Sequence, residues 1–430
     1  MITRTAPYDS GENSKNQKCI LLFRYYFVLL SPKCDTYEVF NRFSVGVHME
    51  KIEIKTVNNL KDLKQFIQFH YDLYRDCPQA VPFLYSDEMN TLRKDRNACF
   101  DFCEVEYFMA FRDGKMVGRV AAIINHRANE RWQRKEVRFG WLDFIDDLEV
   151  SHALIDKVVS WGKEKGMTEI AGPLGFTDMD REGLLIEGFD QEATMYINYN
   201  HPYYVQHIEQ WGGFEKDNDY MEYRVKVPER VPDKFHKIAE MIRKRYNLQV
   251  RKFTRQELIK EGKGKEIFDI INATYKDLYG YSQLSERQIN QLVDQYIKVA
   301  DLNLVTAIED WSTPEHKMVG FGITFPSFNQ ALRKTKDGRL FPFGWWHLLK
   351  VLKWHKTEVV DLLLIGVLPE YRAKGANSLI FDDLIQWFER YGFKWAEAMP
   401  QMESNEHMRG QWQYLEATQH RRHRCYRKSL

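Results

Sequence analysis

The chain has 430 residues, of which 44% are hydrophobic and 29% are charged, as in ordinary soluble globular proteins. This length predicts two buried cores. Its 62 basic and 61 acidic side chains nearly cancel, so no overall charge favours nucleic acid as a partner. Six cysteines are few for this length, and the close pair Cys99 and Cys103 lacks the second pair of a zinc set. We therefore expect a reducing, cytoplasmic setting, and no metal is implied.

Residues 1–48 are predicted to be a poorly structured N-terminal extension. Their one apolar run, residues 20–30, is interrupted by Arg24 and is shorter than the roughly 20 residues of a membrane helix. No small-residue cleavage pattern follows that run, as a signal peptide would require. An alternating strand pattern begins directly at Met49, which suggests Met49 as an alternative start.

Three short patterns occur twice, in the same order. Asp72-Leu73-Tyr74 recurs as Asp277-Leu278-Tyr279, Lys115-Met116-Val117-Gly118 as Lys317-Met318-Val319-Gly320, and Trp161 with Gly166 as Trp387 with Gly392. A repeated order of this kind indicates duplication. We expect a first copy at residues 49–228, a linker and connecting helix at 229–246 with Asp233 as the helix cap, and a second copy at 247–430.

Each copy is predicted to contain a strand, a helix, paired strands and then a strand–helix–strand unit. In the first copy, strands at 105–111 and 116–125 flank a hairpin turn, and a helix is expected at 150–165. In the second copy, strands at 304–309 and 318–325 precede an apolar strand at 359–368 and a helix at 377–391. The predicted fold class is α/β with a mixed sheet.

Residues 369–378 form a basic turn between the apolar strand and the helix of the second copy. A diphosphate is bound by backbone N–H groups at a helix N-terminus, where glycine allows close approach and basic side chains add charge. Arg372, Lys374 and Gly375 occupy suitable positions. The first copy has Asp146 and Asp147 after its strand at 137–145, where acidic groups would repel a diphosphate.

The turn V-x-P-x-x-R-x-x-G is similar to the acyl-CoA motif of the GNAT superfamily, [QR]-x-x-G-x-[GA]. Arg372 and Gly375 match it, whereas Asn377 stands where Gly or Ala is usual. The resemblance implies two tandem GNAT-like acyl-CoA acyltransferase domains, with an acyl-CoA as co-substrate. It implies a CoA site formed by Val367, Arg372, Ala373, Lys374, Gly375, Ala376, Asn377 and Ser378. A simple strand–helix loop with solvated charges is the competing interpretation.

Acyl transfer to an amine requires a proton acceptor and a donor for the leaving thiolate. Asp361 is the one carboxylate in the apolar strand, shares side-chain parity with Val367, and would have a raised pKa if buried. Glu403 and Asn405 follow a strand at 394–399, where GNAT proteins often begin a last helix. Trp412 occupies the place of the family's usual donor tyrosine, and Tyr414 is nearby. For each of these candidates, ordinary packing or exposure is the alternative.

The second copy also carries an extra segment, and residues 339–356 within it are rich in aromatic, leucine and cationic side chains. A helix from Trp345 would place Trp345, Leu348, Leu349 and Leu352 on one face. That face could contact an anionic membrane surface, at the inner side of the membrane, or cover an acyl chain. It could equally cover the protein's own core.

The two-copy architecture is similar to that of the bacterial ceramide synthases, which implies a long-chain lipid amine, a sphingoid base, as acceptor. A small-amine N-acetyltransferase and a non-catalytic CoA-fold binding or sensor protein are the alternatives. Two further segments remain open in interpretation. Residues 200–204 with Gly172-Pro173 could line a substrate channel or be ordinary turns, and the basic run at 420–424 is expected to be a solvated helix end or a diphosphate neighbour.

Overall fold

A computed structural model describes residues 51–405, 410–412 and 415–430. The predictions for residues 1–48 therefore lie outside the described part of the chain. The names first copy and second copy are kept for the two predicted ranges, whose boundaries stay predictions. Residues from Ile52 to Leu430 form one unit built on a single mixed sheet.

The sheet contains strands from both copies. The first copy contributes β1 (Glu53–Thr56), β2 (Cys103–Arg112), β3 (Lys115–Asn125), β4 (Glu136–Phe144), β5 (Glu169–Gly172), β6 (Leu184–Glu187) and β7 (Glu215–Lys226). The second contributes β8 (Leu248–Arg251), β9 (Val305–Asp310), β10 (Lys317–Pro326), β11 (Val359–Val367), β12 (Trp395–Met402) and β13 (Ala417–Ser429). Their order is β1-β2-β3-β4-β5-β13-β7-β12-β11-β10-β9-β8, with β6 paired to β13.

Helices cover both faces of this sheet. Those of the first copy are α3 (Leu60–Leu73), α4 (Tyr85–Leu92), α5 (His126–Trp132), α6 (Leu148–Glu164) and α7 (Tyr203–Trp211). From the linker onward they are α8 (Asp233–Tyr246), α9 (Arg255–Lys260), α10 (Lys263–Tyr275), α11 (Glu286–Leu292), α12 (Asn329–Leu332), α13 (Gly344–Trp354), α14 (Pro369–Arg372) and α15 (Asn377–Tyr391).

The apolar pattern of β3 shows how the two faces are filled. Val120 and Ala122 pack in a cluster with side chains of α6, whereas Ala121 and Ile123 pack in a second cluster with side chains of α3. Successive residues of a strand point to opposite faces, so β3 is buried on both sides. The second copy has its own large core.

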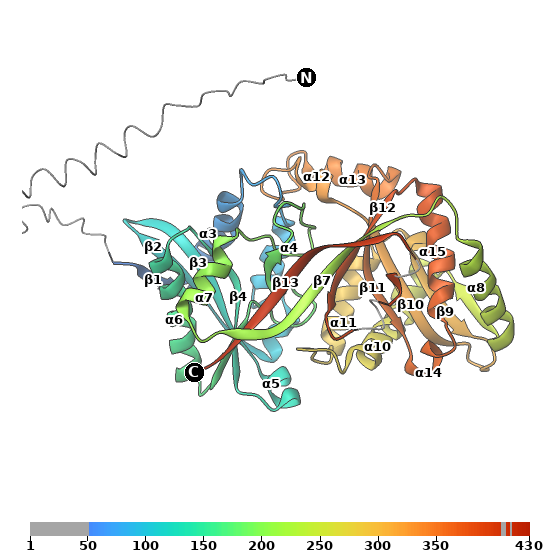
Figure 1. Cartoon of the computed structure of the whole chain (residues 1–430), viewed down its shortest axis with the longest axis horizontal. Coiled ribbons are helices and arrows are strands. Elements are labelled where there is room, and N and C mark those ends of the chain that lie inside the picture. Colours follow the sequence, from blue (N-terminus) through green and yellow to red (C-terminus); the bar gives the residue numbers. More distant parts are fainter. Residues whose placement is uncertain (1–50, 406–409, 413–414) are drawn as a thin grey trace, which may run out of the picture. The chain divides into compact units, whose positions relative to one another are not determined.

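The copies exchange strands at the centre of the sheet. β7, the last strand of the first copy, pairs with β12 of the second, and β13, the last strand of the chain, pairs with β5 of the first. β7 and β13 also pair with each other, and Figure 1 shows them crossing side by side between the two groups of helices. Each copy thus completes the sheet of the other.

Most predicted elements are present. The hairpin is confirmed by the pairing of Arg112 with Lys115, and α15 has the predicted bounds. The connecting helix is α8, but Asp233 is its first residue and Pro232 occupies the cap position, so the predicted cap is wrong by one residue. Asp233 lies in the first turn, where a negative charge interacts favourably with the helix dipole, but no side chain caps α8 with a hydrogen bond.

The extra segment of the second copy packs on the first copy through a turn at Gly338. The backbone N–H of Tyr85 donates to the Gly338 carbonyl at 3.1 Å, and the Arg339 guanidinium lies 3.5 Å from the centre of the Tyr85 ring. Gly338 has φ of 66°, and a Cβ there would lie 1.7 Å from the carbonyl oxygen of Phe83. Only glycine allows this approach.

Candidate active site

The basic turn of the second copy leads directly into the N-terminus of α15. Gly375 has φ of 77°, and the cap residue Ala376 makes no side-chain hydrogen bond to the helix. Arg372 is exposed, and its Nε donates to the carbonyl of Val367 at 2.8 Å. The Lys374 ammonium lies 4.1 Å from the centre of the Tyr371 ring. The first turn of α15 therefore has cations beside it and no side-chain cap.

The remaining predicted CoA-binding residues surround that turn. Ala373 is exposed and Asn377 is half-buried. Ala376 is buried, and the Ser378 hydroxyl donates to the Gly375 carbonyl at 2.8 Å. Together they fix the turn, while Arg372 and Lys374 supply its positive charge.

The equivalent helix of the first copy, α6, is closed at its N-terminus. The Asp147 carboxylate accepts from the backbone N–H groups of Glu149 and Val150, at 3.0 and 3.3 Å, and pairs with Arg112. A carboxylate thus occupies the position that an anion would need. The contrast between α6 and α15 separates the two copies.

In the second copy, β11 and β12 separate beyond their first few residues. Their parallel pairing runs from Val359 with Trp395 to Leu362 with Ala398, although β11 continues to Val367. The pairing of β11 with β10 shifts register at Leu363, so Leu363 is an extra residue in a β-bulge. Leu362, Leu363, Leu364 and Ile365 are all half-buried. Beyond Leu362, no strand among the described residues pairs with β11 on its β12 side.

The first copy repeats the same geometry. β4 and β5 pair only from Glu136 to Arg138, and β4 bulges at Trp141, which has φ of 46°. Both copies therefore have a β-bulge and a splayed parallel pair at equivalent places, as a duplicated unit should.

Asp361 lies at the base of the splay in the second copy. Its side chain is fully buried, and neither carboxyl oxygen forms a hydrogen bond within the described residues. Burial, and next the charge of Glu397, raise the pKa of Asp361 to about 8, although Ser327 and Arg421 oppose the shift. The predicted burial of Asp361 and the direction of its shift are confirmed.

The predicted side-chain parity of Asp361 and Val367 is wrong. Asp361 pairs with Phe325, which shares its sheet face with Phe321 and Gly366, whereas Val367 pairs with Gly320 on the opposite face. The extra residue at the bulge reverses the alternation. Asp361 therefore points away from α15, which packs against Gly322.

Sequence reasoning missed Glu397, which pairs with Asp361 across the two parallel strands. Glu397 is buried, forms an ion pair with Arg224 of β7, and lies 3.0 Å from Nε2 of His420. It lies in β12 between the buried residues Ala396 and Ala398, and its partners come from distant parts of the chain. No local pattern identifies it.

Residues 420–424 are not the expected solvated helix end, because they lie within β13. Arg421 and His423 are buried and lie 2.6 and 2.7 Å from the Glu222 carboxylate. Buried charges require such partners. These contacts join β13 to β7, and the expectation of a diphosphate neighbour stays a prediction.

The other predicted acid–base groups lie apart from Asp361. Glu403 follows β12, six residues beyond Glu397, or roughly 20 Å along an extended chain. It forms an ion pair with Lys216 at 2.7 Å. The backbone N–H of Asn405 donates to the Met402 carbonyl in a turn. Tyr414 lies outside the described residues. Trp412 is buried and donates to Gln401 at 3.0 Å.

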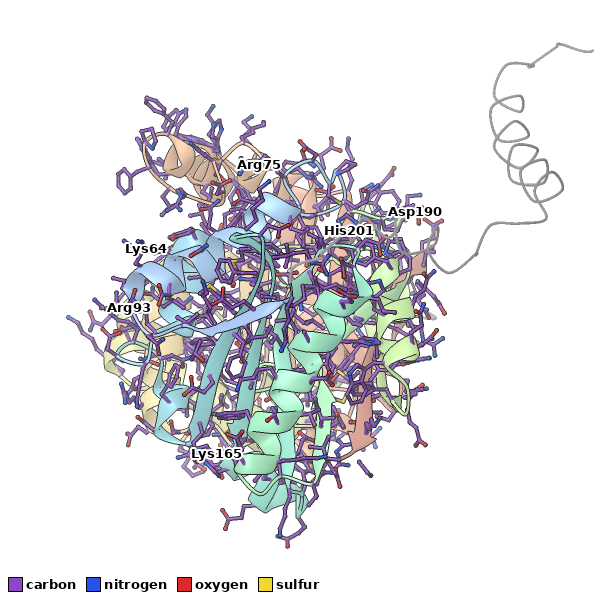
Figure 2. All side chains as sticks on the ribbon, turned by 90° about the vertical axis from the view of Figure 1, so that its left-hand side faces the viewer. Lys64, Arg75, Arg93, Lys165, Asp190 and His201 are labelled. Carbon is purple, nitrogen blue, oxygen red and sulfur yellow. The ribbon has the colours of Figure 1, made fainter. Side chains whose placement is uncertain are left out.

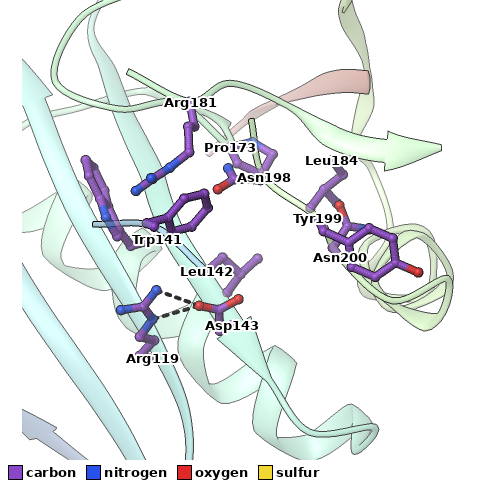
Figure 3. Close-up of a pocket in the computed structure, with 11 residues that line it drawn as sticks. Arg119, Trp141, Leu142, Asp143, Pro173, Arg181, Leu184, Asn198, Tyr199 and Asn200 are labelled. Atoms are coloured by element: carbon purple, nitrogen blue, oxygen red, sulfur yellow. Dashed lines mark hydrogen bonds and ion pairs between the residues drawn. The ribbon is translucent and has the colours of Figure 1, made fainter. Parts of the chain in front are cut away.

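A small cavity of about 30 Å³ lies in the splay of the first copy (Figure 3). It is lined by Arg119, Asp143, Pro173 and Asn200. The last two belong to the segments Gly172-Pro173 and 200–204, which could line a substrate channel or be ordinary turns. Arg119 donates to Asp143 at 2.7 Å, and Asp143 lies 3.0 Å from Nδ1 of His70. A cavity of this size holds about one water molecule. The first-copy splay is thus filled by its own ion pairs.

Comparison with known proteins supports this description. The chain is 28% identical over 382 residues to Protein YghO of Escherichia coli K12, covering 88% of this chain and 95% of that protein. It is 24% identical over 411 residues to the bacterial ceramide synthase of Caulobacter vibrioides, covering 90% and 99%. A solved tandem GNAT protein from the clavulanic acid biosynthesis pathway superposes with a TM-score of 0.51 at 10% identity, over 88% of this chain and 98% of that one. The chain has a tandem GNAT fold.

A second solved structure shares the GNAT fold. The GCN5-related glucosamine N-acetyltransferase region of a fungal multi-domain GH3 β-N-acetylglucosaminidase gives a TM-score of 0.52 at 12% identity, over 88% of this chain and 38% of that chain. No family model matches the sequence. The predicted mixed α/β fold with tandem GNAT copies is therefore confirmed.

Among the described residues, no helix has the length and apolar character needed to cross a membrane. No group of three or more His, Cys, Asp or Glu side chains in that part of the chain could hold a metal ion.

Proposed function

We propose that the chain is an acyl-CoA-dependent N-acyltransferase whose CoA site lies in the second copy. The observation that carries this proposal is the contrast between the N-termini of α15 and α6. The second copy has an uncapped helix beside Arg372 and Lys374, whereas the first copy has Asp147 in that place. Backbone N–H groups and cations at a helix N-terminus suit a diphosphate.

The edge of β11 beyond Leu362 suits the pantetheine arm of CoA. No strand among the described residues pairs with this edge. Two of its carbonyls accept from side chains: that of Ile365 from the Tyr275 hydroxyl at 3.0 Å, and that of Val367 from Arg372 Nε at 2.8 Å. An amide-bearing arm can form strand-like hydrogen bonds with such an edge. The acyl group would then lie near the base of the splay, where Asp361 is buried.

Asp361 is our candidate for the group that accepts the amine proton. The amine nitrogen attacks the thioester carbonyl, the carbon–sulfur bond breaks, and the departing thiolate takes up a proton. A group with a pKa near 8 can accept a proton near neutral pH. Glu397 lies beside it and favours its protonated form. Glu403 is a weaker candidate, because its carboxylate forms an ion pair with Lys216, and the roles of Asn405 and Tyr414 stay predictions.

A long-chain lipid amine is our preferred acceptor. The support comes from the similarity to the bacterial ceramide synthase over nearly the whole of both chains. A small amine is the alternative acceptor, and Asn377 leaves open a non-catalytic CoA-binding protein. Mass spectrometry of products from mixed acyl-CoAs and candidate amines, including a sphingoid base, distinguishes these cases. Long-chain donors with long-chain amines are the expected pair.

The CoA site is tested by calorimetric binding of CoA to Gly375→Asp and Gly375→Asn. Both substitutions place a similar side chain at a position with positive φ, which Asn tolerates best after glycine, but only Asp adds a negative charge. We expect Gly375→Asp to lose CoA binding and Gly375→Asn to keep more of it. Asp147→Asn in α6 should leave CoA binding unchanged. CoA binding that persists in Gly375→Asp would place the site away from this turn.

A further inference from the structure

The segment before and within α13 exposes a cluster of large aromatic side chains. Phe341 and Phe343 are 78% and 75% exposed, and Trp345, Trp346 and Trp354 are 40–47% exposed. We call these five side chains the aromatic patch. A cluster of exposed aromatic rings is costly in water and marks an interaction surface.

The opposite side of α13 accounts for its packing on the protein. Gly344, Leu348 and Val351 are buried, and Leu348 and Val351 belong to the core of the second copy. Trp345, at the start of the helix, is itself 44% exposed. Only the buried face of α13 contacts the core, so packing on the core does not account for the aromatic patch. A fixed helix therefore presents the patch outward.

Positive charge surrounds the patch. Residues 328–357 contain the cations Arg333, Lys334, Lys336, Arg339, Lys350, Lys353 and Lys356, and their one acidic residue is Asp337. Asp337 accepts from Gln68 at 3.1 Å and lies 3.8 Å from Arg75 of the first copy. None of the five lysines takes part in an ion pair with another described residue. Lys350 lies 5.3 Å from the Trp346 ring centre and Lys353 lies 5.7 Å from that of Trp354.

The segment lies at one edge of the described unit. In Figure 1 α12 and α13 are at the top, and in Figure 2, turned by 90°, the same ribbon is again at the top, near the label of Arg75. Lys165 lies at the bottom of Figure 2. The edge is therefore accessible to a large, extended partner.

We propose that the aromatic patch and its lysines dock the protein peripherally on an anionic lipid surface. Aromatic rings favour the boundary between headgroups and acyl chains, and lysines pair with lipid phosphates. α13 has 11 residues, so it lies along the surface instead of spanning it. The charge of the segment selects an anionic surface over a neutral one. This docking is independent of which copy binds CoA.

The test is cosedimentation of the full chain with large vesicles of phosphatidylcholine alone or mixed with phosphatidylglycerol. We expect binding to the mixed vesicles, weaker binding at high salt, and little binding to phosphatidylcholine alone. Phe341→Ala with Phe343→Ala, and separately Lys350→Glu with Lys353→Glu, should each lower the partition coefficient by roughly tenfold or more.

Matched controls lie on other surfaces. Trp311 is 43% exposed in the turn after β9, and Lys115 and Lys163 are exposed in the first copy. Trp311→Ala, and Lys115→Glu with Lys163→Glu, should bind vesicles as the original chain does. Circular dichroism of every variant checks its fold.

Several results would overturn the proposal. The first is that the unaltered chain binds no anionic vesicles. The second is that the Lys115 and Lys163 control weakens binding as much as the Lys350 and Lys353 pair. The third is that analytical ultracentrifugation shows a dimer that Phe341→Ala with Phe343→Ala dissociates while vesicle binding persists, since the patch would then be an interface between two copies of the chain.

Discussion

Asp361 and Glu397 are neighbours on adjacent strands, yet their carboxyl groups have different surroundings. Glu397 has Arg224 and His420 beside it, whereas Asp361 has no hydrogen-bond partner among the described residues. A buried carboxyl without a cation keeps its proton to higher pH. Glu397 thus has partners of its own, whereas burial raises the pKa of Asp361, to about 8.

Asp361→Asn tests this difference through stability. Because the folded pKa is raised to about 8, the protonated carboxyl favours folding at low pH, and this contribution is lost as the pH rises through about 8. The melting temperature of Asp361→Asn relative to the original chain should therefore rise between about pH 5 and pH 9. Thermal melts across that range measure it. A constant difference would mean that Asp361 is ionised throughout, and retained acyl transfer in the variant would exclude it as the proton acceptor.

Glu222 shows the opposite behaviour at the junction of β7 and β13. Burial raises the pKa of Glu222, but Arg421 and His423 outweigh burial and hold the pKa at about 2. Its contribution to stability is fully present at pH values above the usual pKa of a glutamate, and it is lost as the pH falls towards about 2.

Glu222→Gln should cost about 3–5 kcal/mol, because it leaves a buried arginine without its carboxylate. Urea unfolding at neutral pH measures this change in the free energy of unfolding. Glu187→Gln, which removes an exposed partner of Arg422, should cost less than about 1 kcal/mol. Equal costs for the two variants would contradict the role of burial.

At the scale of elements, the sequence predicts periodic segments well and long-range pairs poorly. α15 and β11 were predictable because their apolar periods match a helix and a buried strand. A bulge within a run of apolar residues has no sequence signal, so the sequence could not indicate which face of the sheet Asp361 lies on. The cations of β13 were misread because the carboxylate that allows Arg421 to be buried lies 199 residues earlier.

Gly338→Ala should destabilise the protein by at least about 2 kcal/mol, because its Cβ would overlap the Phe83 carbonyl and its φ is positive. Gly114→Ala is the matched control, since Gly114 has φ of 71° with no atom within 4 Å of the added Cβ. That control carries only the backbone cost, about 1 kcal/mol. Chemical denaturation compares the two, and equal losses would mean that the turn at Gly338 moves freely away from the first copy.

For the whole molecule, the exchange of β7 and β13 is the dominant feature. Arg427 of β13 lies 2.8, 2.6 and 2.6 Å from Glu136, Glu169 and Asp217, all residues of the first copy. The end of the chain thus stabilises its beginning. The repeat in the sequence predicted two copies, but it could not indicate which strands each copy gives to the other.

Ending the chain after Arg424 removes the part of β13 that pairs with β5. We expect the amides of β5 to lose their protection from hydrogen exchange, because the backbone partners of that strand are gone. Amides of α15 should keep more protection, since that helix packs in the second-copy core. Unchanged protection in β5 would show that the exchanged strand is dispensable to the first copy.

A duplicated gene usually leaves one copy free to be deleted once the other performs the task. Here deletion of either copy would take a central strand from its neighbour. Selection on the proposed acyl-transfer site of the second copy would therefore also preserve the first copy, whose helix α6 is capped by Asp147. Because β7 completes the sheet of the second copy and β13 completes that of the first, loss of half of the gene would leave the remaining copy without a central strand. The exchange of strands thus makes the duplication hard to reverse.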